Sequence, residues 1–91
     1  MLERTRRKST TEITFVLPAD QPAGEVSVVG DFNDWQPGAH QLTARRDGMR
    51  SVSVTMLADS RVAFRYLAHG DHWFDDQDAD DHDGTNGYLH T

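Results

Sequence analysis

Hydrophobic and polar residues alternate along several short stretches of the chain, so that every second residue is apolar. The clearest example is residues 50–56, where valine or methionine alternates with serine or threonine. Residues 61–68 and residues 11–17 show the same period over most of their length. A period of two is typical of a strand with one face in the core and the other in solvent. We therefore predict a β-strand at each of these stretches.

Shorter stretches complete the expected strands, and turn signals separate them. The shorter strands are expected at residues 25–29, 41–45, 72–75 and 88–91. Prolines and a glycine within residues 18–24 predict a loop, and Asp47-Gly48 is a strong hairpin signal. No stretch shows the sustained apolar period of an amphipathic helix. About seven short strands with turns between them predict an all-β fold, an antiparallel β-sandwich.

Length and composition bound the possible functions. The 91 residues suffice for one domain, and 36% hydrophobic residues support a thin two-layer core but no large substrate cavity. An ordinary glycosidase barrel needs roughly 250 residues. The absence of cysteine excludes disulfides and thiolate chemistry. No apolar run approaches a signal-peptide core or a membrane span, so the expectation is a cytoplasmic protein with no membrane partner.

Charge is distributed unevenly along the chain. The net charge is −6, with basic residues crowded into residues 4–8 and aspartates crowded into residues 71–83. An acidic chain is a poor general binder of nucleic acid, because neutralising phosphates requires a basic face. We therefore expect no nucleic-acid partner. The basic cluster precedes the periodic apolar pattern, which predicts a flexible arm over residues 1–10 and a domain over residues 11–91.

The aspartates raise the question of catalysis. Hydrolysis by general acid and base needs two carboxylates held on opposite sides of one bond. The aspartates of residues 71–83 are instead bunched in one window, as in a solvated loop. No serine lies in a glycine-flanked nucleophile elbow. We therefore predict a protein that is not an enzyme, with no catalytic residues and no cofactor.

The same window superficially resembles a calcium loop. An EF-hand loop needs oxygen ligands at its first, third and fifth positions, glycine at the sixth and glutamate at the twelfth. With Gly84 in the sixth position, Ala79 falls in the first and His90 in the twelfth, and neither residue fits. The scattered histidines do not have zinc-site spacing. We predict no metal ligands, and a looser calcium site among the carboxylates stays open as the weaker interpretation.

The tryptophans, Trp35 and Trp73, lie beside polar residues and not within an alternating apolar face. The flat face of an indole suits the apolar C–H face of a sugar ring, whose hydroxyls need hydrogen bonds at the rim. Arg65, on the polar side of its strand, and the amides of Asn33 and Asn86 offer such bonds. Two interpretations stay open from the residues alone: a shallow carbohydrate platform, or two indoles that plug the ends of the sandwich.

Several motifs resemble one protein family. Residues 26–35, VSVVGDFNDW, resemble the signature of the glycogen-binding early-set domains. These are carbohydrate-binding module family 48, the isoamylase N-terminal domains and the glycogen-binding domain of the AMP-activated protein kinase beta subunit. FRYLAHG at residues 64–70, WFDD at 73–76 and GTNG at 84–87 follow in the family's order, so the resemblance covers roughly residues 12–91. One residue more than in the kinase-type domain separates Gly70 from Trp73.

The resemblance implies an immunoglobulin-like β-sandwich that binds α-1,4-linked glucan, such as glycogen or starch, without catalysis. It implies that Trp35 and Trp73 stack on glucose units and that Arg65 bonds sugar hydroxyls. It also implies that Asn33 and Asn86 lie at the binding site, and that Phe32 packs inward.

Two other functions are open. A regulatory or protein-interaction module would dock on a glucan-metabolising glycoside hydrolase or branching enzyme. Its edge strand, expected at residues 88–91, would pair with a partner sheet. A small glycosidase is the third interpretation, and it would release reducing ends from soluble starch.

Overall fold

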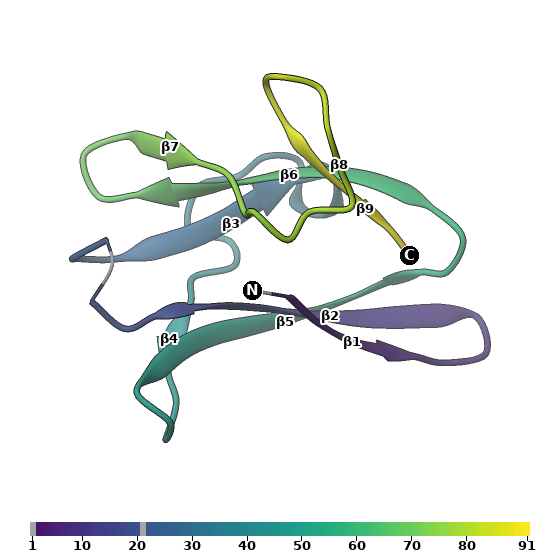
Figure 1. Cartoon of the computed structure of the whole chain (residues 1–91), viewed down its shortest axis with the longest axis horizontal. Helices are drawn as coiled ribbons and strands as arrows, with labels where there is room; N and C mark the ends of the chain where they lie inside the picture. The colour runs from purple at the N-terminus through teal and green to yellow at the C-terminus, as the bar shows by residue number, and fades with distance from the viewer. Residues whose placement is uncertain (1, 21) are drawn as a thin grey trace.

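The structure, a computed structural model, describes residues 2–20 and 22–91. In this part of the chain the regular structure is almost all β, with nine short strands and one turn of 3-10 helix, η1, at Asp31–Asn33. The strands form two antiparallel sheets that pack face to face (Figure 1). The predicted all-β antiparallel sandwich is confirmed. No helix in the described ranges is long and apolar enough to cross a membrane.

The first sheet has the strand order β1-β2-β5-β4. Its strands are β1 (Leu2–Arg6), β2 (Thr10–Pro18), β5 (Met49–Leu57) and β4 (Thr43–Ala44). The central pair is β2 and β5, which align from Thr10 opposite Leu57 to Pro18 opposite Met49. These are two of the stretches with the clearest alternation, and the pairing aligns their apolar faces.

The second sheet is built around β6 (Arg61–Ala68). Its other strands are β3 (Val26–Gly30), β7 (His72–Phe74), β8 (Asp81–His82) and β9 (Gly87–His90). β3 covers one edge of β6, while β7 and β9 share the opposite edge end to end. β8 pairs with the outer side of β9. The outer face of this sheet therefore carries side chains from five strands.

The core lies between the two sheets and is made by the inward-facing residues of the alternating strands. Three aromatic rings are at its centre: the Phe15 ring centroid lies 5.4 Å from that of Phe64 and 6.2 Å from that of Tyr66. Phe32 stacks on Phe15 at 5.8 Å and packs against the core, as the resemblance implied. The loop that contains Phe32 is therefore anchored to the interior.

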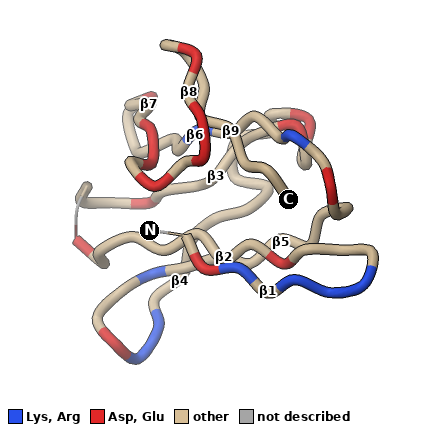
Figure 2. Tube along the Cα trace, turned by 45° about the vertical axis from the view of Figure 1, so that its right-hand side comes forward, with Lys and Arg blue, Asp and Glu red and all other residues tan. Residues whose placement is uncertain are grey.

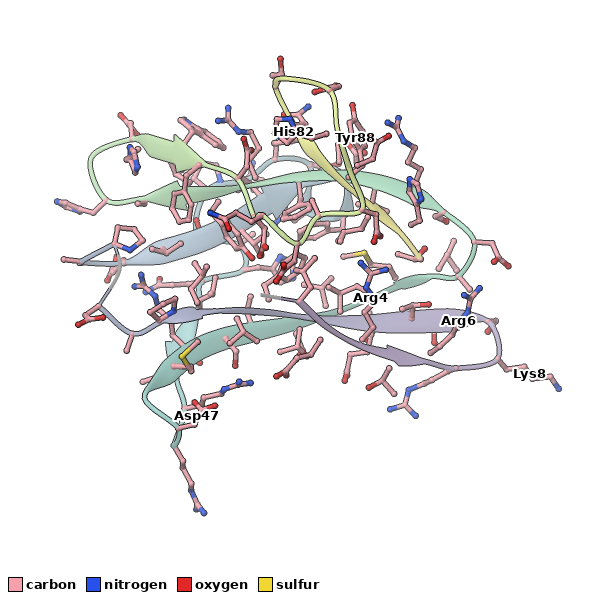
Figure 3. The ribbon with its side chains drawn as sticks, in the orientation of Figure 1. Arg4, Arg6, Lys8, Asp47, His82 and Tyr88 are labelled. Carbon is pink, nitrogen blue, oxygen red and sulfur yellow. The ribbon has the colours of Figure 1, made fainter. Side chains whose placement is uncertain are left out.

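The basic N-terminal segment differs from the expected flexible arm. Leu2–Arg6 form β1, which pairs antiparallel with residues 11–15 of β2. Arg4 and Arg6 donate hydrogen bonds to Asp80 and Asp59, each at 2.8 Å (Figure 3). Charged residues are common on edge strands because they face solvent. The segment has no apolar face, which is why alternation did not reveal it as a strand.

The C-terminal strand also differs from expectation, because it is not an edge. β9 lies between β6 and β8. Beyond the short β8 pairing, the Asp80 carboxylate accepts a hydrogen bond from the backbone N–H of His90 at 2.8 Å. The backbone edge expected to receive a partner sheet at residues 88–91 is thus largely occupied within the chain.

Candidate functional site

The β6–β7 hairpin brings Arg65 and Trp73 together on the outer face of the second sheet. Trp73 pairs with Leu67, and Arg65 lies two residues before Leu67, on the same face. The guanidinium carbon of Arg65 is 5.6 Å from the centroid of the Trp73 ring, within the range of a cation–π contact. Trp73 is 38% exposed, one of the most exposed large apolar residues in the structure. The arginine therefore holds an indole at the surface.

A chain of charged contacts extends from this pair. Arg65 Nε donates to Asp75 Oδ1 at 3.3 Å, and Asp75 Oδ2 lies 2.8 Å from His82 Nε2. His82 belongs to β8 (Figure 3). The contacts from Arg65 through Asp75 to His82 therefore tie the β8–β9 hairpin to β6. Within the described residues the terminal nitrogens of Arg65 make no hydrogen bond. Their N–H donors are therefore available to a ligand.

Trp35 lies in the loop after β3 and is fixed through Asp31. The Trp35 indole N–H donates to Asp31 Oδ1 at 3.1 Å, and Asp31 Oδ2 accepts the backbone N–H of Ala63 at 3.0 Å. Trp35 is half-buried. In residues 2–20 and 22–91, no ring contact or hydrogen bond joins Trp35 to Trp73 or Arg65. Direct contact therefore does not join the two indoles into one platform.

Asn33 is engaged within its own loop. Its Oδ1 accepts the backbone N–H of Gly30, and its Nδ2 donates to the carbonyl of Val28, both at 3.0 Å. Nδ2 also lies 2.9 Å from His40 Nδ1. Both ends of the amide are used, so Asn33 shapes the loop that carries Trp35. The sequence motif identified Asn33 as a candidate site residue, but its position in the motif did not indicate that it shapes the loop.

Asn86 lies in the turn between β8 and β9, and no hydrogen bond or ring contact joins it to the Arg65–Trp73 pair. Its backbone N–H donates to Asp83 Oδ1 at 2.7 Å, and the Tyr88 hydroxyl donates to Asp83 Oδ2 at 2.6 Å. These bonds, with one from the Thr85 N–H, hold the pKa of Asp83 well below its usual range. Asp83 thus organises this turn.

The aspartates of the C-terminal window act mainly as internal acceptors, which the expectation of a solvated loop did not include. Figure 2 shows their concentration around β7 and β8. Asp76 is buried and accepts the Tyr66 hydroxyl at 2.6 Å. Burial, together with the charge of Asp76, raises the pKa of Tyr66 far above its usual value. Across the described residues, no group of three or more histidine or acidic side chains is arranged to hold a metal ion.

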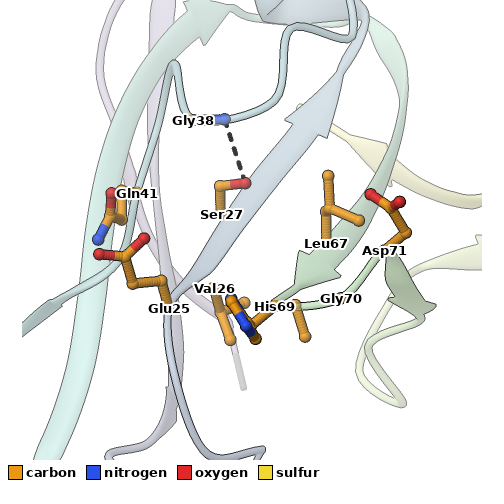
Figure 4. Close-up of a pocket in the computed structure, with 10 residues that line it drawn as sticks. Glu25, Val26, Ser27, Gly38, Gln41, Leu67, His69, Gly70 and Asp71 are labelled. Atoms are coloured by element: carbon orange, nitrogen blue, oxygen red, sulfur yellow. Dashed lines mark hydrogen bonds between the residues drawn. The ribbon is translucent and has the colours of Figure 1, made fainter.

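A polar pocket of about 230 Å³ lies on the outer face of the second sheet (Figure 4). Two of its lining residues, Ser27 and Leu67, lie in one cross-strand row with Trp73. Its walls come from the start of β3, the end of β6, the turn before β7 and the loop that follows Trp35. The alternation of residues gave no sign of it, because all four of these segments are loops or strand ends. Its lining residues are Glu25, Val26, Ser27, Gly38, Gln41, Leu67, Ala68, His69, Gly70 and Asp71.

The chain matches no protein-family model and no curated protein sequence.

Proposed function

We propose that this protein is a non-catalytic α-glucan-binding module, in which a glucose unit stacks on Trp73. The observation that carries the proposal is the Arg65–Trp73 pair: an indole that is 38% exposed beside a guanidinium with free N–H donors. The ring supplies an apolar plane for the C–H face of the sugar, and Arg65 supplies donors for hydroxyls at its rim. The resemblance to the glycogen-binding early-set domains supports the same substrate class.

The charge of the molecule favours a neutral ligand. The net charge is −6, and aspartates gather around the hairpins that flank Trp73 (Figure 2). Polyanions would be repelled from this surface, whereas a neutral glucan carries no such penalty. The platform is shallow and covers a small area, so affinity for a single glucose unit is expected to be weak. Affinity for a polymer is higher, because the glucan offers many equivalent glucose units along its length.

Affinity electrophoresis in a native gel containing glycogen or amylose tests the proposal. The wild-type protein should be retarded, and Trp73→Ala should remove most of the retardation. Leu57→Ala is the matched control, since Leu57 is 72% exposed and lies on β5 in the other sheet. Absence of retardation for the folded wild type would contradict glucan binding. Retardation that survives Trp73→Ala would contradict the stacking site.

The alternative function, docking on a glucan-metabolising enzyme, has a different edge strand available. The β9 edge is covered by β8 and Asp80, whereas β1 lies at the margin of the first sheet with four exposed residues. Main-chain pairing with a partner sheet would use this edge. A pull-down from amylase-treated lysate distinguishes the two functions, because glucan-bridged partners are lost and directly bound partners are kept.

A further inference from the structure

The polar pocket shares a cross-strand row with the exposed indole. Ser27 of β3 pairs with Leu67 of β6, and Leu67 pairs with Trp73 of β7. Ser27 and Leu67 both line the pocket, and Leu67 is the cross-strand neighbour of Trp73. The pocket therefore adjoins the surface around the indole. Adjacent strands lie about 4.8 Å apart, which places the backbone at Ser27 roughly 10 Å from that at Trp73. Two linked glucose units span such a distance.

Four polar side chains of the pocket have no partner within the described residues, whereas Ser27 is hydrogen-bonded to Gly38. Glu25, Gln41, His69 and Asp71 line it, and within the described residues their side chains make no hydrogen bond or ion pair. This contrasts with Asp75, whose carboxylate is held by Arg65 and His82. Side chains without internal partners are solvated in the free protein and available to a ligand.

The walls of the pocket are held in place by contacts behind them. Arg50 is buried, and its guanidinium donates to the carbonyls of Pro22 and Gly24, each at 2.6 Å, which fixes the loop just before Glu25. Ser27 Oγ accepts the backbone N–H of Gly38 at 3.3 Å, which fixes the opposite wall (Figure 4). A concave site with fixed walls binds with a smaller ordering cost than a mobile loop.

We propose that this pocket is a second sugar subsite, which binds the hydroxyls of the glucose unit next to the one stacked on Trp73. The inference rests on the proposed function and adds a direction: the glucan crosses the strands from β7 over Leu67 towards β3. The carboxylates of Glu25 and Asp71 accept hydroxyl protons, and the Gln41 amide both donates and accepts.

The lining also defines the ligand class. It contains two carboxylates and no lysine or arginine. An anionic ligand is therefore disfavoured. A neutral polyol fits, because each carboxylate can accept bonds from two neighbouring hydroxyls. Leu67 is half-buried, and its apolar side chain suits the C–H groups of the sugar rings on either side of the linkage.

The test is an NMR titration of the ¹⁵N-labelled 91-residue chain with glucose, maltose and maltotriose. The wild type should bind maltose and maltotriose more tightly than glucose, and the amides of Ser27 and Gly38 should shift only with the longer sugars. The double variant Glu25→Ala/Asp71→Ala should bind glucose like the wild type but weaken maltotriose binding roughly tenfold. The ¹⁵N spectrum of each variant shows directly whether it is folded.

The matched control is Glu12→Ala/Asp20→Ala. It removes the same residue types and the same charge, from positions that make no side-chain hydrogen bond in the described structure and lie outside the pocket. It should bind all three sugars like the wild type. Equal maltotriose binding by the pocket variant and this control would overturn the subsite while leaving stacking on Trp73 intact. Loss of all sugar binding in the single variant Trp73→Ala would support one continuous site along the row from Trp73 over Leu67 to Ser27.

Two further outcomes separate failure of the subsite from failure of the function. A wild type that binds none of the sugars overturns the proposed function and the subsite together. Shifts of the pocket amides with Ca²⁺, but not with maltotriose, would assign the pocket to a cation and overturn the sugar subsite alone.

Discussion

Arg65 and Arg61 make the same kinds of contact on the same strand, but only Arg65 lies beside the exposed indole. Arg65 contacts Trp73 and Asp75, whereas Arg61 lies 3.6 Å above the Tyr88 ring and pairs with Asp81. Both alternate with core residues of β6 and point to the outer face. In the proposed function, Arg65 therefore has a binding role, and Arg61 has a purely structural one.

We expect Arg65→Met to weaken maltotriose binding about three- to tenfold, because the variant keeps the apolar stem but loses the hydrogen-bond donors and the cation–π contact. Isothermal or NMR titration measures the change. Arg61→Met is the control and should leave the affinity unchanged. Equal losses in the two variants would show that Arg65 acts only through general surface charge.

Asn33 shows how far a motif can indicate a role. The resemblance placed it at the binding site, but its amide is used by the backbone of Gly30 and Val28. Trp35 depends on the same loop, since Asp31 holds its indole N–H. The sequence could identify the loop as important, but only the hydrogen bonds show which side chains build it and which are exposed.

At the scale of strands, alternation predicted β2, β5 and β6 well because each buries one face against the other sheet. β1 and β8 were missed for a physical reason: their residues are almost all exposed, so no apolar period marks them. They are held by pairing and by ion pairs with distant residues. A single sequence does not show which aspartate meets which arginine.

Asp80 links elements from both sheets. It accepts hydrogen bonds from Arg4 on β1 and from the backbone N–H of His90 on β9, each at 2.8 Å. Burial alone would raise its pKa, but these bonds outweigh burial and lower it. β1 is therefore attached to the sandwich at a second point besides its pairing with β2.

We expect Asp80→Ala to lower the free energy of unfolding by about 1–2 kcal/mol, because two hydrogen bonds to a carboxylate are lost. Amide hydrogen exchange in residues 2–6 should accelerate. The control is Asp59→Ala, which removes the partner of Arg6 on the same strand but at a side chain that is 84% exposed, so little stability should be lost. Unchanged exchange in Asp80→Ala would contradict the second attachment.

At the scale of the whole molecule, ionisation limits stability at both ends of the pH range. The pKa values of Asp81 and Asp83 are lowered, the first by the His82 N–H and Arg61, the second by Tyr88 and backbone amides. A lowered folded pKa stabilises the fold above the unfolded value near 4, and this contribution is lost as the pH falls below it. Stability should therefore decline below about pH 4.

The alkaline limit comes from Tyr66, whose pKa is raised by burial and by Asp76. A raised folded pKa stabilises the fold below the unfolded value of about 10, and this contribution is lost as the pH rises above it. Thermal denaturation of the wild type should show a falling melting temperature above about pH 10. Tyr66→Phe should be less stable at neutral pH but should lose less with rising pH. Parallel curves for the two proteins would contradict this assignment.

The central claim is that a sugar ring covers the exposed face of Trp73, and fluorescence quenching tests it most directly. In Trp35→Phe, Trp73 is the sole tryptophan, so acrylamide quenching reports the accessibility of that indole. Saturating soluble glycogen should reduce the quenching more than a glucan-free buffer of equal viscosity does, because viscosity alone slows the diffusion of acrylamide. Quenching of Trp73 that is unchanged by glycogen at any concentration would contradict the claim.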